Sequence, residues 1–111
     1  MPQVQMELGD GTIVDDPDQE QVAGAVGRLS PGMWSVVLDR GPGGFMQVAY
    51  GTEVGLDEGE FLVIRHPVPG QAGFQLVERD LYEVMAAFKA YARGEDDWAT
   101  RFAWEALDWP D

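Results

Sequence analysis

Apolar and polar residues alternate near the start of the chain, over residues 3–8. Val4, Met6 and Leu8 fall on one side of an extended segment, and the Gln and Glu residues between them fall on the other. This period of two predicts a half-buried strand. The stretch that follows, 9–18, is rich in Gly and Asp and predicts a turn.

A helical spacing of apolar residues replaces this alternation over Pro17–Leu29. The apolar positions recur at intervals of three and four, at Val22, Ala25, Val26 and Leu29. This spacing predicts a helix. Asp16 is placed to cap its N-terminus, with Pro17 at the first helical position. The Ser-Pro-Gly sequence at 30–32 ends the predicted helix.

Four segments in the middle of the chain have the character of strands. They are Met33–Asp39, Phe45–Tyr50, Glu60–His66 and Gly73–Val77. The Gly-rich link 40–44 predicts a hairpin between the first two. The acidic connector 51–59 and the Pro-Val-Pro-Gly sequence 67–70 separate the others.

The C-terminal third returns to a helical period. An apolar stripe runs through Leu81, Val84, Met85, Phe88 and Tyr91. Asp80 and Glu83 have the spacing of a capping box, and Gly94 suits the position just after the last helical turn. We expect a short helical turn next, which carries Trp98, Arg101 and Phe102. A final strand over Trp104–Leu107 follows it.

This order of elements predicts an α+β fold. Consecutive strands joined by short loops favour an antiparallel sheet, of about five strands, with two main helices packed on one face. A chain of 111 residues with 45% hydrophobic residues suits a single domain, 1–111. We expect Trp34, Phe88, Tyr91 and Phe102 to belong to its core and Trp109 to dock against it.

No apolar run approaches the roughly 20 residues of a membrane span. The first residues lack the basic and apolar regions of a secretory signal. We therefore expect a cytoplasmic protein.

The net charge of −13, from 20 acidic and 7 basic residues, narrows the choice of partners. A field of this sign repels phosphate backbones and anionic membrane surfaces, so direct binding to nucleic acid or membrane is disfavoured. A basic protein partner is favoured, because opposite fields raise the rate of encounter. Acidity also keeps proteins in solution, so charge alone leaves both interpretations open.

The acidic residues fall into three clusters that contain neither Lys nor Arg. The clusters are Asp10, Asp15, Asp16, Asp18 and Glu20; then Glu53, Asp57, Glu58 and Glu60; then Glu95, Asp96 and Asp97. Helix capping accounts for only part of this charge. The candidate partner-binding residues are Asp10, Asp15, Asp18, Glu20, Glu53, Asp57, Glu58, Glu60, Glu95 and Asp96.

The residue types that common active sites need are scarce. The chain has no Cys, and His66 is its one His, so we expect neither thiolate chemistry nor a metal site. Ser30 lies in a turn and Ser35 in a strand pattern, and neither has the setting of a nucleophile elbow. The Gly-Pro-Gly-Gly loop, 41–44, lacks the Lys-Ser/Thr of a phosphate-binding loop. We expect no catalytic residue and no cofactor.

The middle and C-terminal parts of the chain carry a family resemblance. Its residues are Gly-Gly-Phe-Met-Gln-Val-Ala-Tyr-Gly (43–51), Glu-Phe-Leu-Val-Ile-Arg (60–65), Phe-Lys-Ala-Tyr-Ala-Arg-Gly (88–94), Glu-Asp-Asp-Trp (95–98) and Phe-Ala-Trp-Glu-Ala-Leu (102–107). Together they resemble small immunity proteins of bacterial polymorphic toxin and contact-dependent competition systems, a family often encoded beside deaminase or nuclease toxins. The resemblance spans about 33–107, and its most specific part is the helix with the Gly94, Trp98 and Trp104–Glu105 that follow it.

The resemblance implies a cytoplasmic protein that binds and blocks a toxin domain and has no chemistry of its own. Toxins that act on nucleic acid tend to present basic clefts, which suits the acidity of this chain. We expect a monomer or a weak homodimer. Two other functions stay open: a non-catalytic adaptor or subunit of a larger assembly, and a domain that binds a small ligand in a deep apolar pocket.

Overall fold

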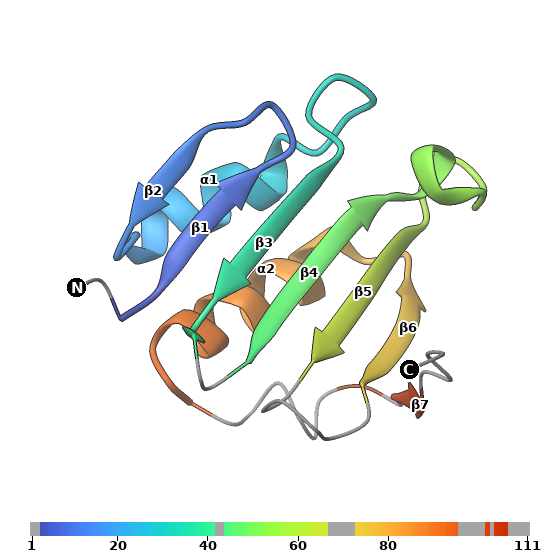
Figure 1. Ribbon diagram of the computed structural model, residues 1–111. Coiled ribbons are helices and arrows are strands. Elements are labelled where there is room, and N and C mark those ends of the chain that lie inside the picture. Colours follow the sequence, from blue (N-terminus) through green and yellow to red (C-terminus); the bar gives the residue numbers. More distant parts are fainter. Residues whose placement is uncertain (1–2, 42–43, 67–72, 96–101, 103, 107–111) are drawn as a thin grey trace.

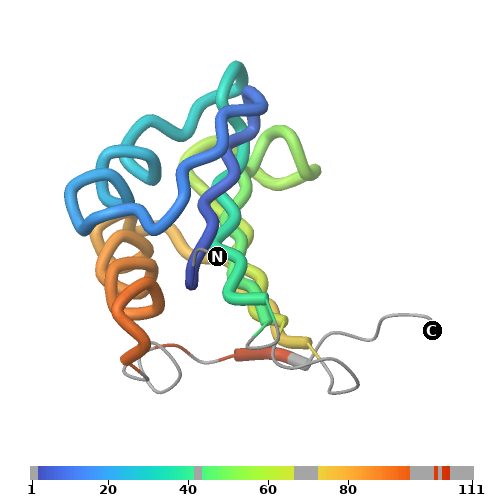
Figure 2. The backbone as a smooth tube through the Cα atoms, turned by 60° about the vertical axis from the view of Figure 1, so that its left-hand side comes forward, coloured from blue at the N-terminus to red at the C-terminus, as the bar shows by residue number. Residues whose placement is uncertain are grey.

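The computed structural model describes residues 3–41, 44–66, 73–95, 102 and 104–106. Their elements, in chain order, are β1 (Gln5–Leu8), β2 (Ile13–Asp15), α1 (Gln19–Gly27), β3 (Ser35–Asp39), β4 (Phe45–Tyr50), the 3-10 helix η2 (Gly51–Val54), β5 (Phe61–His66), β6 (Phe74–Glu78), α2 (Leu81–Ala92) and β7 (Glu105–Ala106). The expected α+β class is confirmed, with an antiparallel sheet and both helices against one of its faces (Figures 1 and 2).

The sheet has more strands than the five or so that we expected. Its order within the described residues is β2-β1-β3-β4-β5-β6-β7, and every neighbouring pair is antiparallel. The strand that no segment of the sequence predicted is β2, which lies in the stretch predicted as a turn and pairs with β1 through Met6 and Val14. Its three residues are too few to show a period of two, so backbone pairing with β1 defines it.

The core lies between the sheet and the two helices. Alternate residues of the strands point toward the helices and are buried: Met6, Leu8, Val36, Leu38, Met46, Val48 and Val63. Val22, Ala25 and Val26 of α1 and Val84, Ala87 and Phe88 of α2 meet them. Burying each large apolar side chain of this kind contributes about 1.5–3 kcal/mol, so this layer stabilises the packing of the helices on the sheet.

Helix α1 begins later than the sequence indicated, because Asp18 rather than Asp16 is its N-cap. The Asp18 carboxylate accepts from the N–H of Gln21 (2.8 Å), whose side chain accepts in return from the N–H of Asp18 (2.9 Å). Asp16 has a φ of 47°, a conformation that cannot enter a right-handed helix. Its carboxylate instead accepts from the N–H groups of Gln3 (2.8 Å) and Val4 (3.0 Å), beside the start of β1.

Helix α2 begins after Asp80, the expected N-cap, and Gly94 follows it with a φ of 79°. The bonds at its start differ from the expected capping box with Glu83, because the Asp80 carboxylate accepts from the N–H of Tyr82 (3.0 Å) and the Asp80 N–H donates to Glu78 (2.9 Å). Within the described residues, neither helix is long and apolar enough to cross a membrane.

The aromatic residues divide between core and surface. Phe88 and Tyr91 are buried as expected, and Phe102 packs against the core. Trp34, which directly precedes β3, was expected inside, but 38% of it is exposed. Trp98, Arg101, Leu107 and Trp109 lie outside the described residues.

Candidate partner-binding surface

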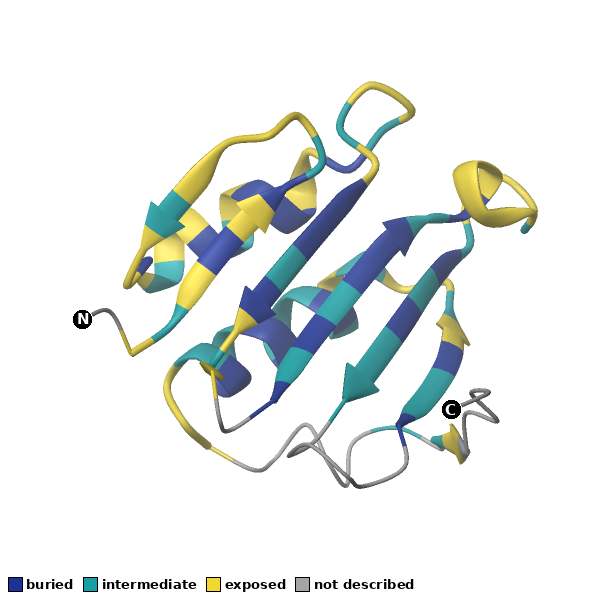
Figure 3. Ribbon diagram, in the orientation of Figure 1, coloured by how far each residue is buried: buried dark blue, intermediate teal, exposed yellow. Residues whose placement is uncertain are grey.

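The sheet face that points away from the helices forms a second surface, which we call the open face. In Figure 2 both helices lie on one side of the sheet and η2 projects on the other. The open face consists of the strand residues that alternate with the buried ones: Gln5, Glu7, Ile13, Asp15, Val37, Asp39, Phe45, Gln47, Leu62, Ile64, His66, Gln75, Val77 and Glu105. Figure 3 shows this alternation as buried and partly exposed bands along β3, β4 and β5.

Apolar side chains occupy much of the open face. Ile13 is 56% exposed and Val77 47%, while Leu62 and Ile64 are half-buried. The ring of Phe45 stacks on that of His66 at a centroid distance of 5.3 Å. Apolar residues gathered on an exposed face, with polar residues around them, are typical of a protein interaction site.

Acidic side chains flank this apolar area, with Glu7, Asp15 and Asp39 on β1, β2 and β3 and Glu105 on β7 at the opposite edge of the sheet. Glu7, Asp15, Asp39 and Glu105 are all exposed. Among the open-face positions that the structure describes, none is Lys or Arg. The charged side chains at the described positions of the open face are therefore acidic, which favours a basic partner.

A groove opens at one end of this face, between the connector 51–59 and strands β5 and β6. Its volume is about 470 Å³, and its lining consists of Val54, Leu56, Leu62, Gln75, Leu76, Val77 and Glu105. Most of these side chains are apolar, and Glu105 supplies a carboxylate. The groove can therefore receive an apolar group next to a positive charge.

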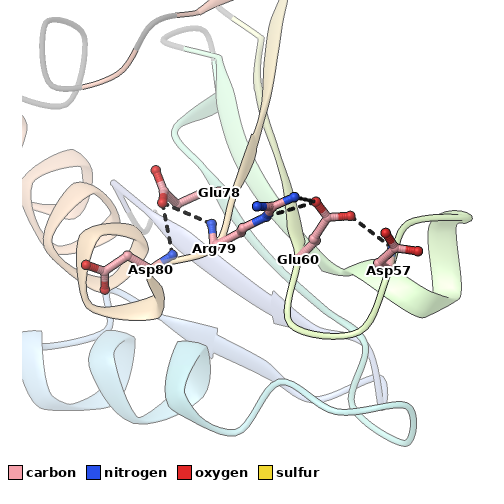
Figure 4. A network of polar contacts seen from close by, with 5 residues as sticks. All are labelled: Asp57, Glu60, Glu78, Arg79 and Asp80. Carbon is pink, nitrogen blue, oxygen red and sulfur yellow. Dashed lines mark hydrogen bonds and ion pairs between the residues drawn. The ribbon is translucent and has the colours of Figure 1, made fainter.

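The outer wall of this groove is held in place by ion pairs and hydrogen bonds, drawn in Figure 4. Glu60 Oε1 accepts from the N–H of Asp57 (3.0 Å), and Oε2 accepts from Nε (3.1 Å) and Nη2 (2.9 Å) of Arg79. The carboxylate of Glu78 accepts from the N–H groups of Arg79 and Asp80 (both 2.9 Å). The connector is thus tied to the junction between β6 and α2.

These contacts also change the acidity of Glu60. Its side chain is only 14% exposed, whereas that of Arg79 is 79% exposed. The hydrogen bond from the Asp57 N–H, and then the bond and charge of Arg79, lower the pKa of Glu60 below its usual 4.5. Glu60 is therefore an internal anchor of the connector rather than a free surface charge.

The backbone of the connector is also well defined. The Leu56 N–H donates to the Gly51 carbonyl (2.8 Å), and Gly55 closes η2 with a φ of 83°. A Cβ on Gly51 would collide with the carbonyl of Glu60, so only Gly fits there. The groove is consequently formed before any partner arrives.

The first acidic cluster does not form one surface. Asp10 closes a turn by accepting from the N–H of Thr12 (2.9 Å), a bond that lowers the pKa of Asp10. Asp15 lies on the open face and accepts from the side chain of Gln5 (3.1 Å). Asp18 caps α1 and Glu20 lies in its first turn, both on the helix side of the sheet. Of these candidates, Asp15 alone is a strand residue of the open face.

The residues of the other two acidic clusters also lie in different parts of the structure. Glu53, Asp57 and Glu58 are exposed on the connector, beside the groove. Glu95 pairs with Arg93 (2.7 Å) just after α2. Asp96 and Asp97 lie outside the described residues.

The sequence clusters left out Glu7, Asp39 and Glu105, which the sheet brings to the open face. Glu7 carried a usable signal, because it falls on the polar side of the alternating segment 3–8. That Glu7 lies opposite Val37 of β3, however, follows only from the register of the two strands.

No metal centre is present in the part of the chain that the structure describes, since no three of its His, Asp and Glu side chains are arranged to hold an ion. Comparison of the chain with models of known protein families, with curated protein sequences and with solved structures found no match in any of the three.

Proposed function

We propose that this chain is a cytoplasmic immunity protein that binds and neutralises a toxin domain through its open face. The observation that carries the proposal is an apolar sheet face flanked by Glu7, Asp15, Asp39 and Glu105, with no Lys or Arg among its described positions. The family resemblance over 33–107 supports a toxin that acts on nucleic acid, such as a deaminase or nuclease. Such a toxin presents a basic cleft to its substrate, and an acidic surface can occupy that cleft.

The two parts of the open face have different roles in this mechanism. The carboxylates attract a basic cleft over distances of about 8–10 Å at moderate salt and so raise the association rate. The apolar area supplies affinity once it is buried, because desolvated apolar contacts carry most of the binding energy of an interface. Inhibition then follows by occlusion, without any reaction on this chain.

Co-expression with the product of the gene that neighbours its own tests this function. We expect growth to be restored and a stable one-to-one complex to be purified, with an affinity that falls as salt is raised. If the neighbouring gene product is not toxic, or is toxic but neither bound nor neutralised, the proposal is rejected.

A matched pair of triple variants locates the interface in that complex. Glu7→Gln, Asp39→Asn and Glu105→Gln together remove charge from the open face, whereas Glu20→Gln, Glu83→Gln and Glu95→Gln remove the same charge away from that face. We expect association to slow by about tenfold in the first variant and by about twofold or less in the second. Equal slowing in both would exclude the open face as the interface.

The groove favours a second function, the binding of a small apolar ligand. Its volume of about 470 Å³ falls within the usual range of ligand sites. Thermal stabilisation by free indole or a short-chain alcohol, in the absence of any protein partner, would support this alternative.

A further inference from the structure

The groove beside the connector has a more specific role, which rests on the proposed function. We propose that it receives one large apolar side chain of the partner, from a segment in which Lys or Arg residues stand next to that side chain. The groove would thus be the anchor point of an interface that the rest of the open face completes.

The lining of the groove determines the apolar part of this ligand. Val54 and Leu56 form one side, and Leu62 and Val77 form the floor on neighbouring strands. About 470 Å³ is room for a Trp, Phe or Leu side chain with some of its backbone. Side chains that fill a pocket of this kind, surrounded by contacts that exclude water, dominate the binding energy of protein interfaces.

The acidic residues around the groove determine which partner residues can lie next to the apolar side chain. Glu105 lines the groove itself, while Glu53 and Asp57 are the sequence neighbours of Val54 and Leu56 in its wall. The connector sequence 51–60 contains no base, and the exposed Arg79 beside it is paired with Glu60. A Lys or Arg beside the anchor would meet these carboxylates, whereas an acidic neighbour would be repelled.

The same charges argue against a second copy of this chain as the occupant. A symmetric dimer through the open face would bring Glu7, Asp39 and Glu105 of both copies together. With a net charge of −13 on each copy, that contact would be repulsive. A basic segment of another protein is the occupant that the groove fits.

The groove also requires little rearrangement to bind. Glu60 fastens the wall to Arg79, and Gly51 fixes the turn at its base. A preformed site loses little conformational entropy when it is filled. We therefore expect even a short peptide with the right side chains to bind measurably.

Three synthetic peptides test the proposal on the intact protein. They have the sequences Gly-Lys-Trp-Lys-Gly, Gly-Lys-Ala-Lys-Gly and Gly-Glu-Trp-Glu-Gly, with both ends blocked. Their binding to ¹⁵N-labelled protein is followed by amide chemical shifts. We expect the first peptide to shift the amides of Val54, Leu62 and Val77, and the other two to bind at least about fivefold more weakly.

A matched pair of substitutions tests the location. Val77 and Ile13 are exposed apolar residues on the same face, but only Val77 lines the groove. Val77→Ser should weaken the binding of the Lys-Trp-Lys peptide by about fivefold, whereas Ile13→Ser should weaken it by less than about twofold. The ¹⁵N spectrum of each variant shows whether the fold is retained.

Several results would overturn the anchor proposal. Equal binding of the Lys-Ala-Lys peptide would mean that charge alone acts, and equal binding of the Glu-Trp-Glu peptide would favour the small-ligand function. Amide shifts confined to other surfaces, or the absence of any amide shift at millimolar concentrations of the Lys-Trp-Lys peptide, would also refute the proposal. Each of these results would leave toxin neutralisation to be decided by the co-expression experiment, so the two proposals can fail separately.

Discussion

Glycine has opposite effects on stability at two positions of this chain. Gly51 lies so close to the carbonyls of Glu60 and Asp57 that a Cβ has no room, whereas a Cβ on Gly24 of α1 meets nothing within 4 Å. We expect Gly51→Ala to lower the free energy of unfolding by about 1–3 kcal/mol. We expect Gly24→Ala to raise it by about 0.5–1 kcal/mol, because Ala favours the helix. Urea denaturation measures both, and a stable Gly51→Ala variant would show that the connector can move.

Tyr91 provides a prediction about alkaline pH. Its ring is buried below the guanidinium of Arg40, which lies 4.9 Å from the ring centroid. Burial raises the pKa of Tyr91 to about 12, and the charge of Arg40 opposes only part of this rise. The folded state binds this proton more tightly than the unfolded state, whose pKa is near 10, so the resulting stability is complete below pH 10 and is lost as the pH rises through about 12.

Spectrophotometric titration of tyrosinate, with unfolding measured at each pH, checks this prediction. Tyr91→Phe should remove the ionisation near pH 12 and weaken the dependence of stability on pH between 10 and 12. An ionisation near pH 12 that persists in the variant would contradict the assignment.

Among the elements, the connector depends on the pair formed by Glu60 and Arg79. Since the pKa of Glu60 is lowered, its stabilising effect is present above about pH 4.5 and is lost as the pH falls through the lower, folded-state value. Arg79→Gln should raise the pKa of Glu60 only part of the way to 4.5, because the N–H of Asp57 still donates to the carboxylate. Carboxyl ¹³C titration measures this change. An unchanged pKa would mean that Arg79 contributes nothing to holding the connector.

The helices show how far local sequence predicts an element. The stripe through Val84 and Phe88 and the cap at Asp80 were sufficient for α2, because they repeat over several turns. For α1 the same reasoning chose Asp16 over Asp18, since both precede helical residues and both suit an N-cap. The backbone at Asp16 decided between them, and its conformation depends on bonds to Gln3 and Val4, more than ten residues away.

On the scale of the whole molecule, the net charge of −13 is confined within a radius of gyration of 12.9 Å. Mutual repulsion of the carboxylates opposes folding, and salt weakens it once the screening length falls below the molecular radius. We expect the urea midpoint to rise as NaCl increases from about 0.01 M to about 0.5 M. The variant with Glu7, Asp39 and Glu105 neutralised should show a smaller rise. A midpoint that falls with salt in the unaltered protein would mean that attractive ion pairs, such as Arg79–Glu60, outweigh the repulsion.

The α+β class, the second helix, the central strands and the negative charge could all be predicted from the amino-acid sequence, because periodicity, capping residues and composition are properties of short segments. The pairing of β2 with β1, and the shared face of Glu7, Asp39 and Glu105, became known only from the folded chain. It also separated Glu60, which is bound within the fold, from Asp57 and Glu58, which are exposed. These outcomes depend on strand register and on contacts between distant residues, which no local pattern of apolar and charged residues contains.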